Sequence, residues 1–455
     1  MGADGEANDL DVVVVGAGVA GAACARFLAE GGRRVALVDR RPRASAGARW
    51  VNGVPSAVFD EVGLARPLPP ELRGAGHRFV VAPPSGRARV TIDDNPIAEV
   101  DMRLLGDRLR AGAVAAGARL LDETAVDGVL VADGRVRALE TRHGTLRAPL
   151  FVDASGLPAV VRRAVFPRWP DVSRGDLCLA AQQVHQIADD AGAARFLATH
   201  ELDDGAVIAW TGTHGGYSVL NVRVERGKGE VGVLTGAVPD SGTSGVAMID
   251  EFIGRERWIG ARVFGGAGAL PLRRPYARLV APGLALLGDA GSQMFPAHGS
   301  GIAIGLRAAR LLADVVLDAP IERAGDHELL WRYAARFHRR HAGTLQGYDV
   351  VRRMAQAFSR DESEELFWAG LASPRTTRAA LAQELPRLDP REVIATLRGA
   401  ARAPRLAVKV AAALGKLPFL VANALTYPTT PDLGALARYE RRVARLVGDD
   451  VDPIA

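Results

Sequence analysis

Cysteine and lysine are both scarce in this sequence of 455 residues. The two cysteines, Cys24 and Cys178, are too few and too far apart to indicate a disulfide framework or a metal site, and they suit a reducing cytosol. Lysine occurs only at Lys228, Lys409 and Lys416, so arginine carries almost all of the basic charge behind the net +5. No basic block is interleaved with aromatic residues, which argues against a nucleic-acid partner.

Long uncharged apolar runs are also absent, because no stretch reaches the ~18 residues of a membrane span. Residues 1–11 are acidic and polar, and the apolar run that follows predicts a buried strand rather than a signal peptide. We therefore expect a cytoplasmic protein that is soluble or peripherally membrane-associated. Residues 402–425 mix basic and apolar side chains. Such a segment either rests on a membrane surface or, as we favour, covers a core as a helix pair.

The order of predicted elements indicates an α/β fold with a Rossmann-like dinucleotide-binding domain. Apolar strands at 10–15 and 35–38 flank a helix at 22–30, as in a parallel sheet covered on both faces. Residues 101–116 have helical spacing, and almost everything after 326 is predicted helical. Further strands are predicted at 120–122, 126–132, 136–142, 150–153, 206–211, 217–224, 230–234 and 279–287.

This order predicts three units. The first is a discontinuous cofactor-binding domain made of residues 8–45, 100–165 and 279–320. The second is a substrate-binding domain with an antiparallel sheet, made of residues 46–99 and 166–278. The third is a helical C-terminal region, residues 321–455.

A glycine-rich turn joins the first predicted strand to the first helix. Gly16 permits the tight turn, Gly18 lets the backbone approach a pyrophosphate, and Gly21 lets helix and strand pack closely. The helix N-terminus points its N–H groups and positive dipole end at the phosphates. Asp39, at the end of the next strand, can accept hydrogen bonds from both ribose hydroxyls. The turn therefore predicts a dinucleotide site.

A second motif, Gly288-Asp289, follows another strand some 250 residues downstream of Asp39. The Asp289 carboxylate can accept a hydrogen bond from a ribityl hydroxyl. Twelve residues later Gly301-Ile302 begins a helix whose N-terminus can stabilise negative charge on the N1/O2 edge of a reduced flavin. The pairing of the two motifs favours FAD over NAD.

With these motifs, Arg103 and the segment Val152-Asp153-Ala-Ser-Gly156, the chain resembles the FAD superfamily of aromatic hydroxylases, flavin halogenases and geranylgeranyl reductases. The resemblance implies that Asp289 meets the ribityl chain, that Arg103 lies along the ribityl-phosphate region and that the backbone near Val126 meets adenine. An ordinary exposed arginine is the alternative at Arg103. The predicted cofactor-binding residues are Gly16, Ala17, Gly18, Val19, Ala20, Gly21, Asp39, Arg40, Arg49, Arg103, Val126, Gly288, Asp289, Gly299, Ser300, Gly301 and Ile302.

The helical tail is similar in layout to the C-terminal region of geranylgeranyl reductases. That resemblance implies reduction of an isoprenoid or related alkene by hydride from flavin N5. An external donor, NAD(P)H or a reduced carrier protein, would supply the electrons, since no second dinucleotide-binding turn follows a strand. The family's aromatic-rich strand and its Cys-Gly segment beside the flavin are missing. A flavin-dependent monooxygenase therefore stays open as an alternative, and a non-catalytic FAD-binding module as a second. Halogenation is disfavoured, because no WxWxIP segment occurs.

His298 is the titratable side chain of the loop predicted to border the flavin ring, and with an ordinary pKa near ~6.5 it is the candidate proton donor or acceptor. The alternative is that it only hydrogen-bonds backbone. Trp50, Tyr217 and Trp210 are the predicted lining of a pocket for a hydrophobic small-molecule substrate.

Overall fold

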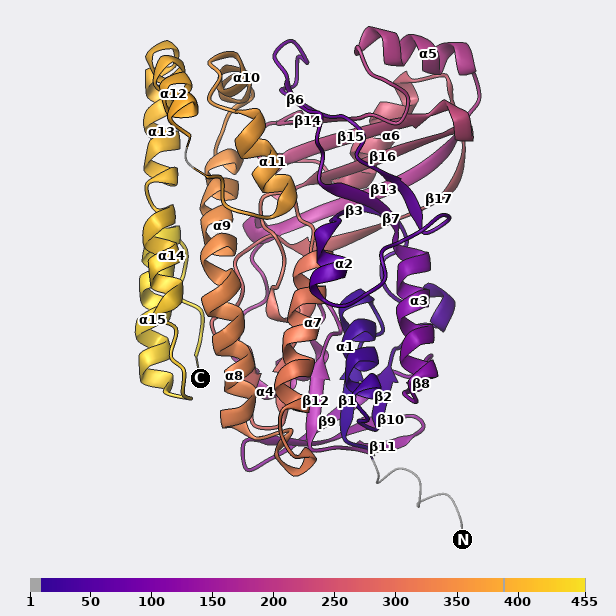
Figure 1. The fold of residues 1–455 in the computed structure, drawn as a ribbon, viewed down its shortest axis with the longest axis vertical. Coiled ribbons are helices and arrows are strands. Elements are labelled where there is room, and N and C mark those ends of the chain that lie inside the picture. The colour runs from indigo at the N-terminus through magenta and orange to yellow at the C-terminus, as the bar shows by residue number, and fades with distance from the viewer. Residues whose placement is uncertain (1–9, 388, 455) are drawn as a thin grey trace.

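The computed structural model describes residues 10–387 and 389–454. A six-stranded sheet, in the order β18-β19-β12-β1-β2-β8, occupies the lower half of Figure 1. Its strands are β1 (Val12–Val15), β2 (Val35–Val38), β8 (Arg119–Leu121), β12 (Leu150–Asp153), β18 (Val280–Ala281) and β19 (Leu284–Leu286). All pair in parallel except β18 with β19. Residues of β1, β2 and β12 are all buried, as expected for strands covered on both faces.

Helices α1 (Val19–Glu30), α3 (Met102–Ala115) and α7 (Ile302–Leu317) pack side by side against this sheet. A three-stranded antiparallel sheet of β9 (Val126–Ala132), β10 (Arg135–Thr141) and β11 (Gly144–Arg147), followed by α4 (Val160–Val165), contributes apolar side chains to the same core. The α/β fold predicted from the sequence is confirmed.

A seven-stranded sheet forms the upper half of Figure 1, in the order β17-β13-β16-β15-β14-β5-β6. Its strands are β5 (Phe79–Ala82), β6 (Val90–Ile92), β13 (Leu177–Ile187), β14 (Val207–Thr211), β15 (Ser218–Glu225), β16 (Glu230–Ala237) and β17 (Ile259–Pro271). The pairing is antiparallel except between β14 and β5. Helices α5 (Asp190–Thr199) and α6 (Gly245–Arg255) cover one face, where they bury a separate apolar cluster.

A smaller sheet, β3-β7-β4, lies opposite the other face of the large sheet. It consists of β3 (Val51–Pro55), β7 (Ile97–Asp101) and β4 (Leu72–Ala75), and α2 (Ala57–Glu61) follows β3. The sequence predicted only loops and short strands between 44 and 96. It gave no indication of the 13-residue β17, because glycines at 265, 266 and 268 interrupt its pattern.

The C-terminal part is helical and stands along one side of both sheets (Figure 1). Its helices are α8 (His327–Phe337), α9 (Gly343–Gln356), α10 (Arg360–Trp368), α11 (Pro374–Ala382), α12 (Pro390–Arg402), α13 (Pro404–Leu414), α14 (Leu417–Leu425) and α15 (Leu433–Val447). Pro374, Pro390 and Pro404 each occupy the first turn of a helix, where a missing N–H costs nothing.

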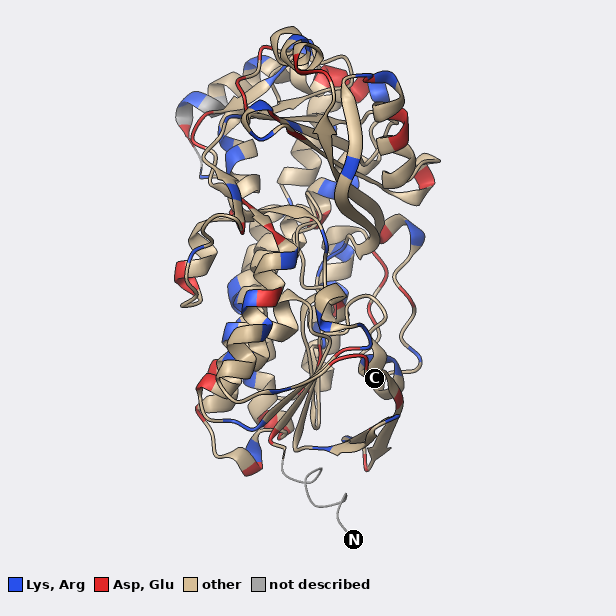
Figure 2. Ribbon diagram, turned by 90° about the vertical axis from the view of Figure 1, so that its right-hand side faces the viewer, with Lys and Arg blue, Asp and Glu red and all other residues tan. Residues whose placement is uncertain are grey.

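One helical segment of the described residues, Pro404–Leu425, is long and apolar enough to cross a membrane by length and composition alone. The segment contains Arg405, Lys409 and Lys416, so the expectation that no uncharged apolar run of ~18 residues occurs still holds. On the face shown in Figure 2, acidic and basic residues are interspersed rather than gathered into a field of one sign.

Candidate functional site

The turn between β1 and α1 is shaped by its glycines. Gly16 has a φ of +105°, and a Cβ there would lie 2.2 Å from the carbonyl oxygen of Ala154. At Gly21 a Cβ would lie 1.9 Å from the carbonyl oxygen of Gly16. Gly18 is different, because its Cβ would have only the Cα of Gly47, at 3.9 Å, as a neighbour. Gly16 and Gly21 are thus needed for packing, and Gly18 keeps the approach to the α1 N-terminus open.

Gly18 is also the N-cap of α1, and no side chain caps the helix there. The first N–H groups of a helix have no partner within it, so they can donate to an anion. Val19 and Ala20 open this first turn, and Ala17 precedes it. The backbone geometry suits a pyrophosphate at this point.

Asp39 lies beside the turn at the carboxyl end of β2. Its carboxylate accepts hydrogen bonds from the N–H groups of Ala17, at 2.7 Å, and Arg41, at 2.9 Å. A carboxylate has further lone pairs, which remain for ribose hydroxyls. The carbonyl oxygen of Asp39 accepts from Thr124 N–H, which places Val126 and the start of β9 close by. Arg40 follows β2 and is exposed.

Two of the predicted cofactor-binding arginines, Arg49 and Arg103, have partners within the protein. Arg49 donates to the carbonyl oxygen of Ala44 in its own loop. Arg103 pairs with Asp101, with 2.6 Å between Nη2 and Oδ2, and its guanidinium stacks 3.5 Å from the ring centre of Phe264. Its predicted contact with the cofactor stays a prediction.

Arg110, which the sequence analysis missed, is 2% exposed and donates to the carbonyl oxygens of Ala17 and Ala46. It fixes the glycine turn against the loop before β3. Nothing in the local pattern of α3 distinguishes this arginine from an exposed one.

Asp289 lies in the short 3-10 helix Gly288–Gly291, directly after β19 and Leu287. Its carboxylate Oδ1 would be 3.3 Å from a Cβ on Gly301, so it faces the N-terminus of α7. Burial raises the pKa of Asp289 to about 6. No described residue donates a hydrogen bond to this carboxylate, which leaves it available to a ligand hydroxyl. Gly288 has a φ of +65° and lets the chain pass beside Ala20 of α1.

We expect Asp289→Asn to weaken FAD binding by about 10- to 100-fold, since a hydrogen bond to a charged group contributes roughly 1.5–3 kcal/mol. A hydroxyl donor favours the ionised carboxylate, so the affinity of the wild type should fall as the pH drops through about 6. The FAD affinity of Asp289→Asn should not fall over this pH range. Titration of apoprotein with FAD at pH 5 and pH 7.5, followed by flavin fluorescence, measures both effects.

The contribution of Asp289 to folding stability changes with pH in the opposite direction to its contribution to FAD binding. An acid with a raised pKa loses stability for the folded state as the pH rises through that pKa. The apo form of Asp289→Asn should therefore be no less stable than the wild type at pH 7.5. Asp318→Asn, at an exposed position after α7, is the control. Equal FAD affinities for wild type and Asp289→Asn at both pH values would contradict the assignment.

The loop before α7 is folded back on itself by a bridge between Phe295 and Ser300. Gly299 takes a φ of +71°, and Gly301 and Ile302 begin the helix. Ser300 Oγ donates to the carbonyl oxygen of Gly53 on β3, at 3.4 Å. The loop thus joins α7 of the parallel-sheet domain to the small sheet.

His298 points away from this junction toward α11. Its Nε2 lies 3.3 Å from the carbonyl oxygen of Ala380, and its ring stacks 4.6 Å from that of Phe295. His298 is an exposed residue, and desolvation by the groups around its ring lowers its pKa. The alternative named above was a hydrogen bond to backbone. The observed contact is of this kind, and its acceptor lies in α11. The acid–base role stays a prediction.

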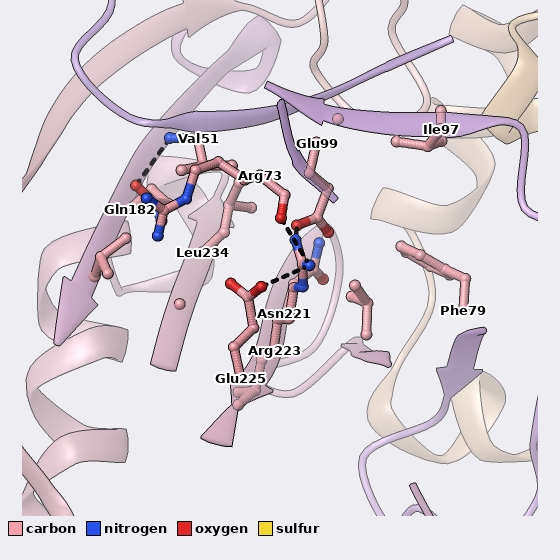
Figure 3. A pocket seen from close by; sticks show the side chains of 15 residues that line it. Val51, Arg73, Phe79, Ile97, Glu99, Gln182, Asn221, Arg223, Glu225 and Leu234 are labelled. Carbon is pink, nitrogen blue, oxygen red and sulfur yellow. Dashed lines mark hydrogen bonds and ion pairs between the residues drawn. The ribbon is translucent and has the colours of Figure 1, made fainter. Parts of the chain in front are cut away.

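A cavity of about 110 Å³, partly open to solvent, lies between the seven-stranded sheet and the small sheet (Figure 3). One part of its wall is apolar: Val51, Phe79, Ile97, Val184, Val207 and Leu234. Another part is charged, and there Arg223 of β15 donates to Glu99 of β7 and to Glu225. The Arg223 side chain is 7% exposed, so these carboxylates compensate a nearly buried cation.

Gly53 connects the cavity to the loop before α7, which we call the cofactor-side loop. It lines the cavity, and its carbonyl oxygen accepts the hydrogen bond from Ser300 of that loop. Val51 N–H donates to Oε1 of Gln182 across the two sheets, at 3.2 Å. The side-chain amide of Asn221 also lines the cavity. The cavity can therefore take an apolar molecule with a polar group.

The three predicted pocket residues are not brought together. Trp50 packs against the glycines of β17, with ring atoms 3.5 and 3.7 Å from the positions of a Cβ on Gly266 and Gly268. Tyr217 is buried beside Gly299 of the cofactor-side loop. Trp210 lies on the opposite face of the large sheet and packs on His200, in the cluster beneath α5 and α6. Trp210 does not line this cavity, because alternate residues of a strand face opposite sides, and its role in a substrate pocket stays a prediction.

The sequence analysis also missed Gln383, directly after α11. It is 6% exposed with a φ of +60°, and its Nε2 lies 3.5 Å from the carbonyl oxygen of Ser300. Its Oε1 has no partner among the described residues. The helical C-terminal part thus reaches the cofactor-side loop through both Gln383 and the Ala380 carbonyl. A lone glutamine after a helix carries no sequence signal of this kind.

The residues present fit FAD. A helix N-terminus opened by Gly18 suits the pyrophosphate, Asp39 the ribose, Asp289 the ribityl chain and the N-terminus of α7 the flavin N1/O2 edge. The unpartnered Asp289 carboxylate is the observation that tests this fit.

A family model described as FAD dependent oxidoreductase matches residues 11–74. A digeranylgeranylglycerophospholipid reductase of Methanoculleus marisnigri is 26% identical over 349 residues, which cover 74% of this chain and 84% of that protein. A menaquinone reductase of Mycolicibacterium smegmatis is 27% identical over 367 residues, or 76% and 83% of the two chains. The solved structure of a geranylgeranyl bacteriochlorophyll reductase-like protein from Thermoplasma acidophilum superimposes with a TM-score of 0.73 at 19% identity, covering 89% of this chain and 99% of that one.

Proposed function

This chain is an FAD-dependent oxidoreductase with a geranylgeranyl-reductase-like fold, and from that premise we propose that it reduces carbon–carbon double bonds of an isoprenoid or related alkene. The observation that carries the proposal is the cavity that meets the cofactor-side loop at Gly53. Its apolar wall suits an alkene chain, since an apolar ligand gains free energy in proportion to the apolar area it removes from water. The relatives named as reductases of isoprenoid compounds support the same substrate class.

Bound FAD in its reduced form would supply a hydride, and NAD(P)H or a reduced carrier protein would restore it. The chain's own residues bind and orient the alkene. The Val51–Gln182 and Ser300–Gly53 hydrogen bonds fix β3 between the cavity and the loop.

The charged part of the cavity wall indicates which kind of polar group the substrate carries. Its two cations, Arg73 and Arg223, are matched by two carboxylates, Glu99 and Glu225. Outside the lining, Glu230 pairs with Arg73 and Lys228 pairs with Glu225. This set has no net charge left for a phosphate. Asn221 offers both a donor and an acceptor. The proposed substrate therefore carries a neutral polar group, such as a hydroxyl or a carbonyl, on its apolar chain.

The test is anaerobic mixing of chemically reduced holoenzyme with geranylgeranyl compounds. We expect flavin reoxidation together with a product two mass units heavier, and a higher rate with the alcohol than with the diphosphate. Failure of every alkene to oxidise the flavin would contradict the proposal. Hydroxylated product with substrate-coupled oxygen consumption in air would instead establish a monooxygenase.

Filling the cavity provides a structural check. Leu234→Trp should lower kcat/KM by about 100-fold, the loss expected when a substrate is displaced by about 1 Å, and should leave FAD affinity unchanged. Val263→Trp, at a half-exposed position on β17, is the control. Unchanged kinetics in Leu234→Trp would show that the substrate binds elsewhere.

A further inference from the structure

Helices α13 and α14, which lie with α12 and α15 in the outer column of helices in Figure 1, have large apolar side chains that are exposed to solvent. We call the segment Pro404–Leu425 the outer helix pair. Val408 is 69% exposed, Phe419 65% and Leu425 59%. Most exposed apolar side chains on a protein are single, but here several follow one another along one segment. Such a patch usually marks an interaction surface.

The exposed residues of the outer helix pair fall into two adjoining stripes. At 3.6 residues per turn, one stripe is apolar and the next is basic. The apolar stripe consists of Val408, Ala412, Gly415, Phe419 and Ala422. The basic stripe consists of the exposed Arg405 and Lys409 and the half-buried Lys416, with Arg402 at the end of α12 just before it. Apolar and basic side chains side by side are typical of helices that lie in a membrane interface.

Within the outer helix pair and the residues next to it in sequence, the charge has one sign. Residues 394–431 contain no aspartate or glutamate. The neighbouring α15 exposes Arg438, Arg441 and Arg445. Only Lys409 has an acidic partner in the described residues, Glu362 of α10. The surface therefore complements a negatively charged partner.

The other side of the outer helix pair is fixed to the protein. Leu406, Val410 and Leu420 are buried. The pair approaches α9 so closely that a Cβ on Gly343 would lie 2.9 Å from the Cα of Val421. Crossing a bilayer would require this packed face to separate from α9. The geometry thus favours a segment that lies on a membrane over one that spans it.

We propose that the outer helix pair docks the protein on the surface of an anionic lipid bilayer, with the apolar stripe in the acyl boundary and the basic stripe at the headgroups. This goes beyond the proposed reaction and does not depend on it. Phe419 and Val408 supply the buried apolar area, and Arg402, Arg405 and Lys416 supply the electrostatic attraction.

The test is sedimentation of the FAD-loaded protein with vesicles of phosphatidylcholine and phosphatidylglycerol in equal parts, against vesicles of phosphatidylcholine alone. We expect binding to the anionic vesicles that weakens with added salt. Val408→Glu/Phe419→Glu should abolish it. Arg402→Gln/Arg405→Gln/Lys416→Gln should weaken it by on the order of 100-fold.

Two matched controls use exposed positions elsewhere on the molecule. Leu68→Glu/Val263→Glu introduces the same two charges at apolar residues that are 73% and 49% exposed. Arg87→Gln/Arg168→Gln/Arg257→Gln removes three exposed arginines outside the surface. Both should bind vesicles like the wild type.

No binding by the wild type, full binding by Val408→Glu/Phe419→Glu, or an equal loss in either control would overturn the proposal. So would light scattering that shows a wild-type dimer split into monomers by Val408→Glu/Phe419→Glu without vesicle binding, because the surface would then join two copies of the chain.

Discussion

Gly18→Ala is expected to fold normally and yet to bind FAD at least about tenfold more weakly, a loss of ~1.4 kcal/mol. The added methyl group meets only the Cα of Gly47, at 3.9 Å, so the protein itself has room for it. It projects at the N-terminus of α1, where the backbone must approach the pyrophosphate closely. A bulkier Gly18→Val should abolish FAD binding.

Gly21→Ala should behave in the opposite way. Its methyl group would lie 1.9 Å from the carbonyl oxygen of Gly16, which belongs to the backbone and cannot give way without moving β1 or α1. We expect insoluble or strongly destabilised protein. Gly254→Ala, at a glycine of helix α6 with open space around its Cβ position, is the matched control for a methyl group added to a helix.

Circular dichroism of the apo forms and FAD titration separate the two effects. An unfolded Gly18→Ala, or a Gly21→Ala with normal stability and FAD affinity, would contradict the roles assigned to the two glycines.

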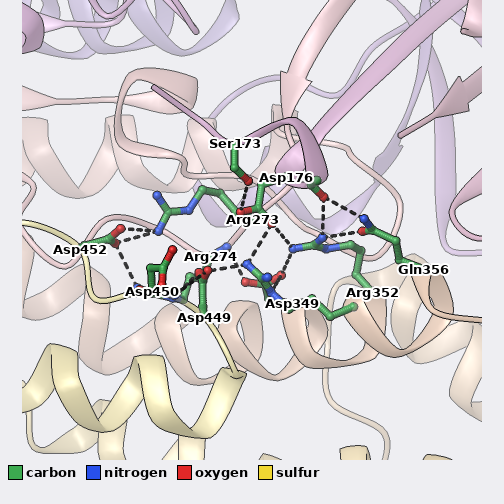
Figure 4. Close-up of polar contacts among 12 residues, drawn as sticks. Ser173, Asp176, Arg273, Arg274, Asp349, Arg352, Gln356, Asp449, Asp450 and Asp452 are labelled. Carbon is green, nitrogen blue, oxygen red and sulfur yellow. Dashed lines mark hydrogen bonds and ion pairs between the residues drawn. The ribbon is translucent and has the colours of Figure 1, made fainter. Parts of the chain in front are cut away.

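The second large effect concerns a buried group of charges that holds the C-terminal segment, shown in Figure 4. Arg274, which is 0% exposed, donates to Glu440 of α15 and to Asp452. Asp349 of α9 accepts from the backbone N–H of Arg274 and pairs with Arg352. Desolvation raises the pKa of Glu440 to about 7, although Arg274 opposes this rise.

Arg274→Met is expected to reduce the free energy of unfolding by about 3–5 kcal/mol, because it leaves buried carboxylates without their cation. Chemical denaturation at pH 7.5 measures the change. Arg441→Met, on the exposed side of α15, should have almost no effect.

The double variant Arg274→Met/Glu440→Met should regain much of the lost stability, since apolar residues of similar volume can replace a buried ion pair. A loss below about 1 kcal/mol in Arg274→Met would show that the group does not hold the C-terminal segment.

The cofactor cradle was predictable because its features are local. Gly16 to Gly21 follow a buried strand and open a helix, and Asp39 ends the next strand. In such a unit, spacing along the chain sets spacing in three dimensions. The strands predicted at 126–132 and 136–142 are found at Val126–Ala132 and Arg135–Thr141 for the same reason, since a short turn joins them.

The substrate side was not predictable in the same way. Which face of β14 and β15 meets the small sheet depends on the register among strands far apart in the chain, and one step in register exchanges the faces. Aromatic composition suggested Trp210, whereas the observed alternation places Val207, Asn221 and Arg223 at the cavity.

The sequence by itself determined the cofactor class and the α/β fold, because glycine conformation, helix N-termini and strand periodicity are properties of short segments. Only the tertiary structure decided which side chains meet around the cavity. It also decided that Arg110 and Gln383 reach the cofactor side, and that one face of the outer helix pair is left uncovered. These outcomes depend on contacts between residues separated by tens to hundreds of positions, which no local pattern encodes.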